Sequence, residues 1–294
     1  MDLVCVGDVM LDIRVDADAL KRGGDVHGRV RLQPGGTSAN AAVWAAWDGA
    51  SSRVHGRIGD DLQGRMLRAA LAERGVDDAL RVDPAAPSGT MLIVHEPGER
   101  SMAADRGANA NLVPEDLPDE IVAGAVLVSG YLLLQALGHA AALAAFERAR
   151  APFVAVEAAS WPLVEAFGVE RFFEETARAN AVFANELEAR TLTGAEGTDA
   201  AAALGERYRL AAVKMGAEGA AVAFDGSVFT AAPEAIEEVD PTGAGDAFDG
   251  VLLAGLARGV TVTDAARRAC HAGALAAASA GTWPEPGARS GARP

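Results

Sequence analysis

The residues with the clearest chemical signature form the loop Asp240-Pro241-Thr242-Gly243-Ala244-Gly245-Asp246, which leads into an apolar helical stretch. Its glycines allow a ligand to approach the backbone closely, and the free amides at a helix start favour negative charge. The pattern predicts a phosphate cradle. A carboxylate beside phosphate needs a task, and Asp246 would accept a proton from a hydroxyl that attacks phosphorus. The simpler alternative is that Asp246 only caps the first turn.

Four further motifs follow one another in a consistent order along the chain. They are GGTSAN at residues 35–40, GDDLQG at 59–64, NELE at 185–188 and KMGAEG at 214–219. Together with the 240–246 loop, this set resembles the PfkB family of carbohydrate kinases, with its ribokinase-like fold, over about residues 3–282. The resemblance implies an ATP-dependent phosphotransferase that acts on a hydroxyl of a sugar or sugar-like molecule. Taken singly, each motif also has a structural explanation, such as a glycine turn or a helix cap.

The resemblance also implies roles for individual residues. The general base is Asp246, with an anion hole at Gly243, Ala244 and Gly245. The residues expected to bind the acceptor are Asp12, Gly36, Asn40 and Arg106. Those expected near the nucleotide are Asn185, Lys214, Gly216, Gly219 and His271. Mg²⁺ would be held indirectly by Glu188, while Asp240 and Thr242 resemble part of the loop that binds a monovalent cation such as K⁺ in some members.

The string GDVMLD at residues 7–12 brings acids to the end of the first expected strand, where ligands bind in open α/β sheets. A carboxylate at Asp12 suits a polyol, because it accepts two hydroxyl protons. Met10 stands where many relatives carry asparagine, so the contact pattern of ribose kinases is not reproduced. Glu157 is a second departure, since many members have aspartate there. Arg106 is a candidate for holding a substrate carboxylate or phosphate, or else a surface arginine.

Short apolar runs alternate with helical stretches. Buried strands are expected at residues 3–7, 54–58, 125–128, 153–156, 181–183 and 210–213, and helices at 38–47, 62–74, 137–150, 186–192, 199–207, 245–258 and 262–280. This alternation predicts an α/β fold with a doubly wound, mostly parallel sheet. Residues 26–32 and 90–94 alternate residue by residue and are expected to pair as a small β-lid, within lid segments near 13–34 and 88–104. The kinase domain would span 1–282, followed by a frayed polar tail at 283–294.

Composition excludes several classes of function. Lys and Arg total 26 against 41 Asp and Glu, so the net charge of −15 disfavours nucleic acid and anionic membranes as partners. The longest apolar run, residues 121–134, is shorter than the ~20 residues needed to span a bilayer. The two cysteines have no paired spacing and no signal peptide precedes the first strand, which predicts a cytoplasmic protein. No P-loop, GxGxxG turn or histidine metal motif is present.

Two alternatives to a sugar kinase stay open. A nucleoside kinase on the same fold would need an apolar shelf for the base, for which Trp44 and Trp47 are candidates, although both suit the core. A non-catalytic protein that binds a sugar or nucleotide as a sensor is the other. The resemblance further implies a homodimer, because the lid often forms the dimer interface in the family. Which acceptor is used does not follow from the sequence.

Overall fold

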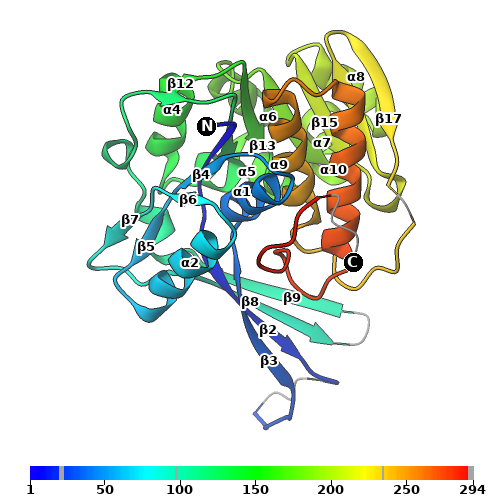
Figure 1. Cartoon of the computed structure of the whole chain (residues 1–294). Coiled ribbons are helices and arrows are strands. Elements are labelled where there is room, and N and C mark those ends of the chain that lie inside the picture. Colours follow the sequence, from blue (N-terminus) through cyan, green and yellow to red (C-terminus); the bar gives the residue numbers. More distant parts are fainter. Residues whose placement is uncertain (20–22, 97–98, 234, 291–294) are drawn as a thin grey trace.

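A nine-stranded sheet in the order β17-β16-β15-β14-β13-β11-β1-β4-β6 forms the centre of the computed structural model (Figure 1). The model describes residues 1–19, 23–96, 99–233 and 235–290, without the side chains of Glu99 and Arg100. The strands of this sheet are β1 (Leu3–Val6), β4 (Ser52–His55), β6 (Asp77–Asp78), β11 (Ala125–Ser129), β13 (Phe153–Glu157), β14 (Ala181–Asn185), β15 (Leu210–Lys214), β16 (Ala220–Phe224) and β17 (Ser227–Ala231). The strands from β15 to β6 run parallel, whereas β16 pairs antiparallel with both β15 and β17.

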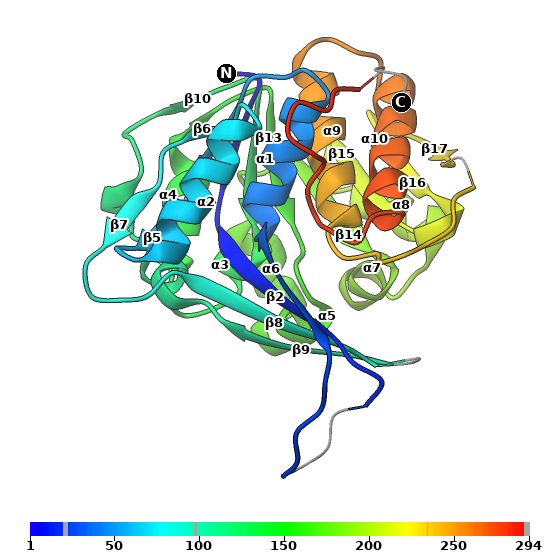
Figure 2. The same cartoon turned by 60° about the horizontal axis from the view of Figure 1, so that its bottom comes forward.

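Helices cover both faces of this sheet (Figure 2). One face carries α1 (Thr37–Trp47), α2 (Leu62–Glu73), α9 (Ala244–Ala257) and α10 (Val262–Ala277). The other carries α3 (Gly130–Leu133), α4 (His139–Arg148), α5 (Trp161–Phe167), α6 (Val169–Glu175), α7 (Glu186–Thr193) and α8 (Gly197–Gly205). In β1, Leu3 and Cys5 point to the first layer and Val4 and Val6 to the second, because side chains alternate along a strand. The predicted α/β, doubly wound, mostly parallel sheet is confirmed.

A second sheet forms the lid, which extends away from the main body (Figure 2). Its strands are β2 (Met10–Asp16), β3 (Arg29–Gly35), β8 (Gly89–Glu96) and β9 (Glu99–Asp105), in the order β3-β2-β8-β9. The predicted small β-lid is therefore confirmed, but its segments near 26–32 and 90–94 do not pair directly, because β2 lies between β3 and β8 and pairs with both. Lid residues 20–22 and 97–98 lie outside the described part of the chain.

The expected strand at 54–58 is divided in two. After β4 the chain leaves the main sheet, and β5 (Arg57–Gly59) pairs instead with β7 (Arg81–Asp83). Likewise, the expected helix at 137–150 ends earlier, since β12 (Ala149–Arg150) pairs with β10 (Ile121–Val122). Short 3₁₀ turns are η1 (Gly107–Asn111), η2 (Pro114–Asp116) and η3 (Gly216–Glu218).

The segment after α10 packs against the body, so the predicted fraying is wrong for residues 283–290. Ser290 N donates a hydrogen bond to Trp47 O at 3.0 Å. Arg74 Nε donates to Pro284 O at 3.0 Å, and its guanidinium lies 5.2 Å from the ring centroid of Trp283. Residues 291–294 lie outside the described part of the chain. The segment of residues 283–290 is thus tied to α1 and α2, on the same side of the sheet as α9.

Candidate active site

The loop predicted to cradle phosphate stands at the start of α9, a helix of 14 residues. Gly243 precedes the helix with φ 82°, a left-handed conformation that glycine adopts without strain. Ala244 N–H donates to Pro241 O at 3.2 Å and closes the turn. Since amides in the first turn of a helix have no intrahelical partner and carry partial positive charge, this turn suits an anion.

Asp246 lies in the first turn of α9, and Asn40 of α1 donates to it. Asn40 Nδ2 is 2.6 Å from Asp246 Oδ2. The two helices approach closely because position 250 lacks a side chain: a Cβ on Gly250 would stand 2.1 Å from Ala41 O. Burial raises the pKa of Asp246 to about 7, against the opposing effects of the Asn40 hydrogen bond and Lys214. A carboxyl group with a pKa near neutrality suits a general base.

Lys214, at the end of β15, lies beside this turn and forms a buried ion pair with α9. Its Nζ is 2.8 Å from Asp249 Oδ2 and 3.1 Å from Asp249 Oδ1. A Cβ on Gly245 would stand 3.2 Å from Nζ, so the ammonium borders the phosphate turn. Burial opposes the charged form, but Asp249, Glu157 and Glu188 together raise the pKa of Lys214. Lys214 is therefore a permanent positive charge at the turn.

The NELE motif forms a capping box at the start of α7. Asn185 Oδ1 accepts from Glu188 N at 2.9 Å, and Glu188 accepts from Asn185 N at 2.8 Å and Nδ2 at 2.6 Å. Glu188 is only 2% exposed, and burial raises the pKa of its carboxyl group to about 7. The helix cap of the simpler explanation is therefore present, but its Glu188 side chain is buried rather than at the surface. Burying a carboxyl group is costly, so a purely local cap would not need it.

Four buried carboxyl groups gather around the single ammonium of Lys214. They are Asp246, Asp249, Glu157 and Glu188, and burial is the first cause that raises the pKa of each. Glu157 Oε1 accepts from Ala159 N at 2.9 Å, whereas its buried Oε2 has no partner within the described residues. Glu157, Asp246 and Asp249 border one small cavity. The site therefore holds more carboxyl groups than cations, and one buried carboxyl oxygen, Glu157 Oε2, has no hydrogen-bond partner among the described residues.

A cavity of about 300 Å³ opens beside the phosphate turn, between η3, α9 and α10. Lys214, Gly216 and Gly219 line it, together with Ala244 and Gly245. The remaining lining side chains are mostly small or apolar, and include Phe248, Ala274 and Ala277. A flat apolar group with an attached anion fits such a space, because its charged end would meet the start of α9.

The acceptor-side candidates meet at the corner between lid and α1. Asp12 is buried in β2, and burial raises the pKa of its carboxyl group to about 7. A Cβ on Gly35 would stand 2.4 Å from Asp12 Oδ2, so β3 passes directly over this carboxyl group. Gly36 is the N-cap of α1, and its carbonyl accepts from Asn40 N at 2.8 Å. Asp12, Gly36 and Asn40 therefore lie on the side of Asp246 that faces the lid.

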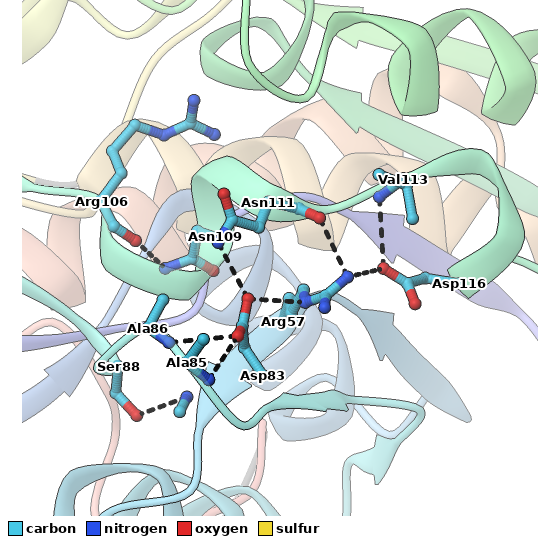
Figure 3. Close-up of polar contacts among 11 residues, drawn as sticks. Arg57, Asp83, Ala85, Ala86, Ser88, Arg106, Asn109, Asn111, Val113 and Asp116 are labelled. Atoms are coloured by element: carbon cyan, nitrogen blue, oxygen red, sulfur yellow. Dashed lines mark hydrogen bonds and ion pairs between the residues drawn. The ribbon is translucent and has the colours of Figure 1, made fainter.

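Arg106 is engaged with the protein itself. Its Nη2 and Nε lie 2.7 and 3.1 Å from the two carboxylate oxygens of Asp8. The guanidinium is therefore not a surface group, and it is paired with Asp8; a role for Arg106 in binding the substrate stays a prediction. Nearby, Asn109 binds both backbone groups of Val9, at 3.0 and 2.9 Å. Figure 3 shows the side chain of Arg106 pointing away from the network of Arg57, Asp83, Asn111 and Asp116 that anchors η1.

Comparison with known proteins decides the family. The model of the pfkB family of carbohydrate kinases matches residues 1–286. The chain belongs to the pfkB family of carbohydrate kinases. It is accordingly a phosphotransferase with an alcohol acceptor.

Characterised relatives of this pfkB-family kinase differ in their acceptors. The chain is 30% identical to a cytidine kinase of Thermococcus kodakarensis, over 91% of this chain and 92% of the relative. It is 32% identical to a fructokinase of Klebsiella pneumoniae, over 86% and 83%. The fructokinase of Vibrio cholerae O395, solved with fructose, ADP and calcium, superimposes with a TM-score of 0.79 at 26% identity, covering 96% of this chain and 94% of that one. The ribokinase-like fold is confirmed.

Two predicted positions in this pfkB-family kinase do not suit their expected roles. His271 is exposed, is not among the residues that line the 300 Å³ cavity, and lies 6.4 Å from the ring of Trp47. Asp240 accepts from Thr242 N and Oγ1 at 2.9 and 2.7 Å, while its Oδ2 pairs with Arg14. A guanidinium thus holds the carboxylate that a monovalent cation would require, so the residues do not fit such a cation.

Three residues of this site were not predicted from the sequence. Asp249 shares the inner face of α9 with Asp246, and its i, i+3 spacing was a usable signal. Arg14 comes two residues after Asp12 in β2, and this spacing places both side chains on the same face of the lid. Trp283 falls in a segment expected to be frayed, and no local pattern pointed to its contact with Asn40.

Proposed function

We propose that this kinase transfers the γ-phosphoryl group of ATP to a hydroxyl of a sugar or sugar-like molecule, with Asp246 as general base. The observation that carries the proposal is the position of Asp246: a buried carboxyl group in the first turn of α9, hydrogen-bonded to Asn40. Beside it lie the phosphate turn and the cavity that together would hold ATP. Acceptor and donor would therefore meet at this carboxylate.

In this proposal the base of ATP occupies the 300 Å³ cavity, next to Gly216 and Gly219. The β- and γ-phosphates lie against Gly243–Gly245, with Lys214 as their charged partner. Asn185 orients Glu188 beside the phosphates. His271 is left out, because it lies outside the lining of the cavity.

The surplus of carboxyl groups over cations in the site fits Mg²⁺. Mg²⁺ is commonly held by one or two carboxylates, retained waters and substrate phosphates. Among the described residues, no three His, Cys, Asp or Glu side chains are placed to hold a metal ion by themselves. Glu188 and Glu157, whose buried Oε2 has no hydrogen-bond partner among the described residues, are the residues proposed to hold Mg²⁺. When bound, Mg²⁺ would neutralise phosphate charge as it develops.

On the acceptor side, Asp12 would accept hydrogen bonds from hydroxyls, and the backbone at Gly36 would allow the sugar to approach α1. The reacting hydroxyl would stand about 3 Å from Asp246 and give it its proton, while Asn40 holds the carboxylate in line. The amides of Gly243 and Gly245 would stabilise the negative charge of the transferred group. The amide of Ala244, also expected in this anion hole, already donates to Pro241 O. The lid would exclude water and so limit ATP hydrolysis.

The direct test is ADP release from Mg-ATP with a panel of ketoses, aldoses, sugar acids, sugar phosphates and nucleosides. One acceptor with strong turnover that depends on Asp246 would support the proposal and name the substrate. Equal ADP release with and without every acceptor, with ATP binding intact, would contradict it and favour the sensor alternative.

A nucleoside acceptor is the second candidate, and it is favoured by the likeness to a cytidine kinase. The proposed shelf for the base does not support it, because Trp44 and Trp47 are buried in α1, at 3% and 8% exposure. The nucleoside arm of the acceptor panel separates the two candidates.

A homodimer formed through the outer face of the lid completes the proposal. On this face Leu32 of β3, Ile13 of β2 and Leu92 of β8 form one cross-strand row. Leu32 is 53% and Leu92 39% exposed, and neighbouring Val30 is 62% exposed. An apolar row of this kind is a natural interface.

Within the described ranges no helix is long and apolar enough to cross a membrane. A cytoplasmic location and the absence of nucleic-acid partners stay predictions.

A further inference from the structure

The segment that follows α10 returns to the active site before it reaches the chain end. Thr282 Oγ1 donates to Pro34 O at 2.9 Å, at the base of lid strand β3. Trp44 Nε1 donates to Thr282 O at 2.9 Å, so α1 holds this segment as well. A Cβ on Gly243 would stand 3.2 Å from Thr282. The segment therefore borders the lid, α1 and the phosphate turn at once.

The next residue, Trp283, makes the contact that matters for catalysis. Its buried indole Nε1 donates to Asn40 Oδ1 at 2.6 Å, and Asn40 Nδ2 donates in turn to Asp246 Oδ2 at 2.6 Å. An indole N–H can only donate, so the Asn40 atom that faces it must be the carbonyl oxygen. The amide nitrogen is then fixed toward Asp246. With the amide reversed, two oxygen atoms would face each other at the carboxylate.

We propose that Trp283 is a positioning residue that fixes the amide of Asn40 and thereby holds Asp246 for proton transfer. The inference rests on the proposed function of Asp246 as general base. No part of the predicted motifs contains Trp283, and it acts on the reaction only through Asn40. Without its N–H, the buried Asn40 Oδ1 loses its donor, and the contact with Asp246 alone is left to orient the amide.

The orientation of the Asn40 amide affects the pKa of Asp246, because charged groups surround this carboxyl group. Asn40 on α1 is a neutral neighbour of Asp246. The titratable groups that interact electrostatically with Asp246 lie on the surrounding elements: Lys214 on β15, Asp249 on α9, Glu188 on α7, Glu157 on β13, Asp12 on β2, Tyr131 on α3 and Cys5 on β1. Most of these are acids, which favour the protonated form of Asp246. The Asn40 hydrogen bond and Lys214 oppose them, so a lost or reversed amide would raise the pKa of the base.

The test is Trp283→Phe, which keeps an aromatic ring and removes the donor. In protein labelled with ¹³C at aspartate carboxyl groups, the Asp246 resonance is identified by its absence in Asp246→Asn. We expect its pKa to rise by about one unit in Trp283→Phe, and kcat/KM at pH 6.5 to fall about tenfold. The KM for ATP should stay unchanged, because Trp283 does not line the cavity proposed for the base.

Trp44→Phe is the matched control, since it removes an equally buried indole hydrogen bond to the same segment without touching Asn40. It should cost similar thermal stability and leave the pKa of Asp246 unchanged. An unchanged pKa in folded Trp283→Phe, or equal shifts in both variants, would overturn the inference. If Trp283→Phe does not fold, benzothienylalanine at position 283 keeps the ring shape and still lacks the N–H.

The titration needs no turnover, so it separates this inference from the proposed function. A wild-type protein without acceptor-dependent ADP release would contradict the function. A pKa insensitive to the Trp283 donor would contradict the inference alone.

Discussion

Asn40 and Asp246 are 206 positions apart in the chain, yet Nδ2 of the first lies 2.6 Å from Oδ2 of the second. Asn40 belongs to the GGTSAN motif, which begins at the end of lid strand β3, and Asp246 belongs to the phosphate turn. The contact joins α1 to α9 at the point where both helices start. In the proposed reaction, the amide that holds the carboxylate and the carboxylate that takes the proton are thus direct neighbours.

Replacement of this base should remove turnover while leaving the fold intact. Asp246→Asn keeps the shape of the side chain and can still bind Asn40, but it cannot take a proton. We expect kcat to fall by at least about 100-fold, the lower end of what general-base catalysis contributes. ADP release with the best acceptor measures it. Asp264→Asn, an exposed acid at the start of α10, is the control and should keep full activity.

The pH dependence of turnover follows from the same carboxyl group. Burial raises the pKa of Asp246 to about 7, and the base works only when deprotonated. We therefore expect kcat/KM to rise with pH and level off above about pH 7. Asp12 has a similar pKa, so the limb belongs to the coupled pair rather than to one residue. A profile of kcat/KM from pH 5.5 to 8.5 that stays flat would contradict the assignment.

Stability should change with pH in the opposite direction. A carboxyl group whose folded pKa is raised binds a proton more tightly in the folded state, so its contribution is full below pH 4 and is lost as pH rises through about 7. Asp246→Asn removes this loss. We expect the variant to be more stable than wild type by about 1–3 kcal/mol at pH 8. The difference should vanish near pH 4, and thermal unfolding of both proteins at the two pH values tests this.

Potassium should not be required. Arg14 pairs with Asp240, so the charge that a monovalent cation would supply is already present. Turnover in KCl, NaCl and choline chloride at equal ionic strength should agree within about twofold. Arg14→Met would leave the buried Asp240 without this partner, and we expect kcat to fall about tenfold. Strong activation of the wild-type enzyme by K⁺ alone would show that Arg14 does not fulfil this role.

The parts that the sequence predicted well are those encoded by neighbouring residues. Strands such as 125–128 and 153–156 are continuous apolar runs that are buried on both faces. In an α/β fold, such a run belongs in the middle of a parallel sheet that helices cover on both sides. The turn at Gly243 and the capping box of Asn185 and Glu188 are likewise complete within a few residues. Local chemistry therefore indicated them directly.

Contacts between distant segments could not be predicted in this way. Arg14 meets Asp240, and Trp283 meets Asn40, only because the lid and the chain end fold back onto the phosphate turn. The order of the lid strands has the same origin. β2 alternates apolar and charged residues from Leu11 to Asp16, but its place between β3 and β8 depends on pairing with segments far along the chain.

The outer face of the lid gives the last prediction, since its apolar row needs cover that the described chain does not supply. Leu32→Glu would bring a charge into the proposed dimer interface and should convert a dimer into a monomer, because an unpaired buried carboxylate is costly. Leu62→Glu is the matched control: Leu62 is an exposed leucine at 65%, on α2 rather than on the lid. Light scattering should then find dimers for wild type and Leu62→Glu. Monomers for all three proteins would contradict a lid interface, and dimers for all three would move the interface elsewhere.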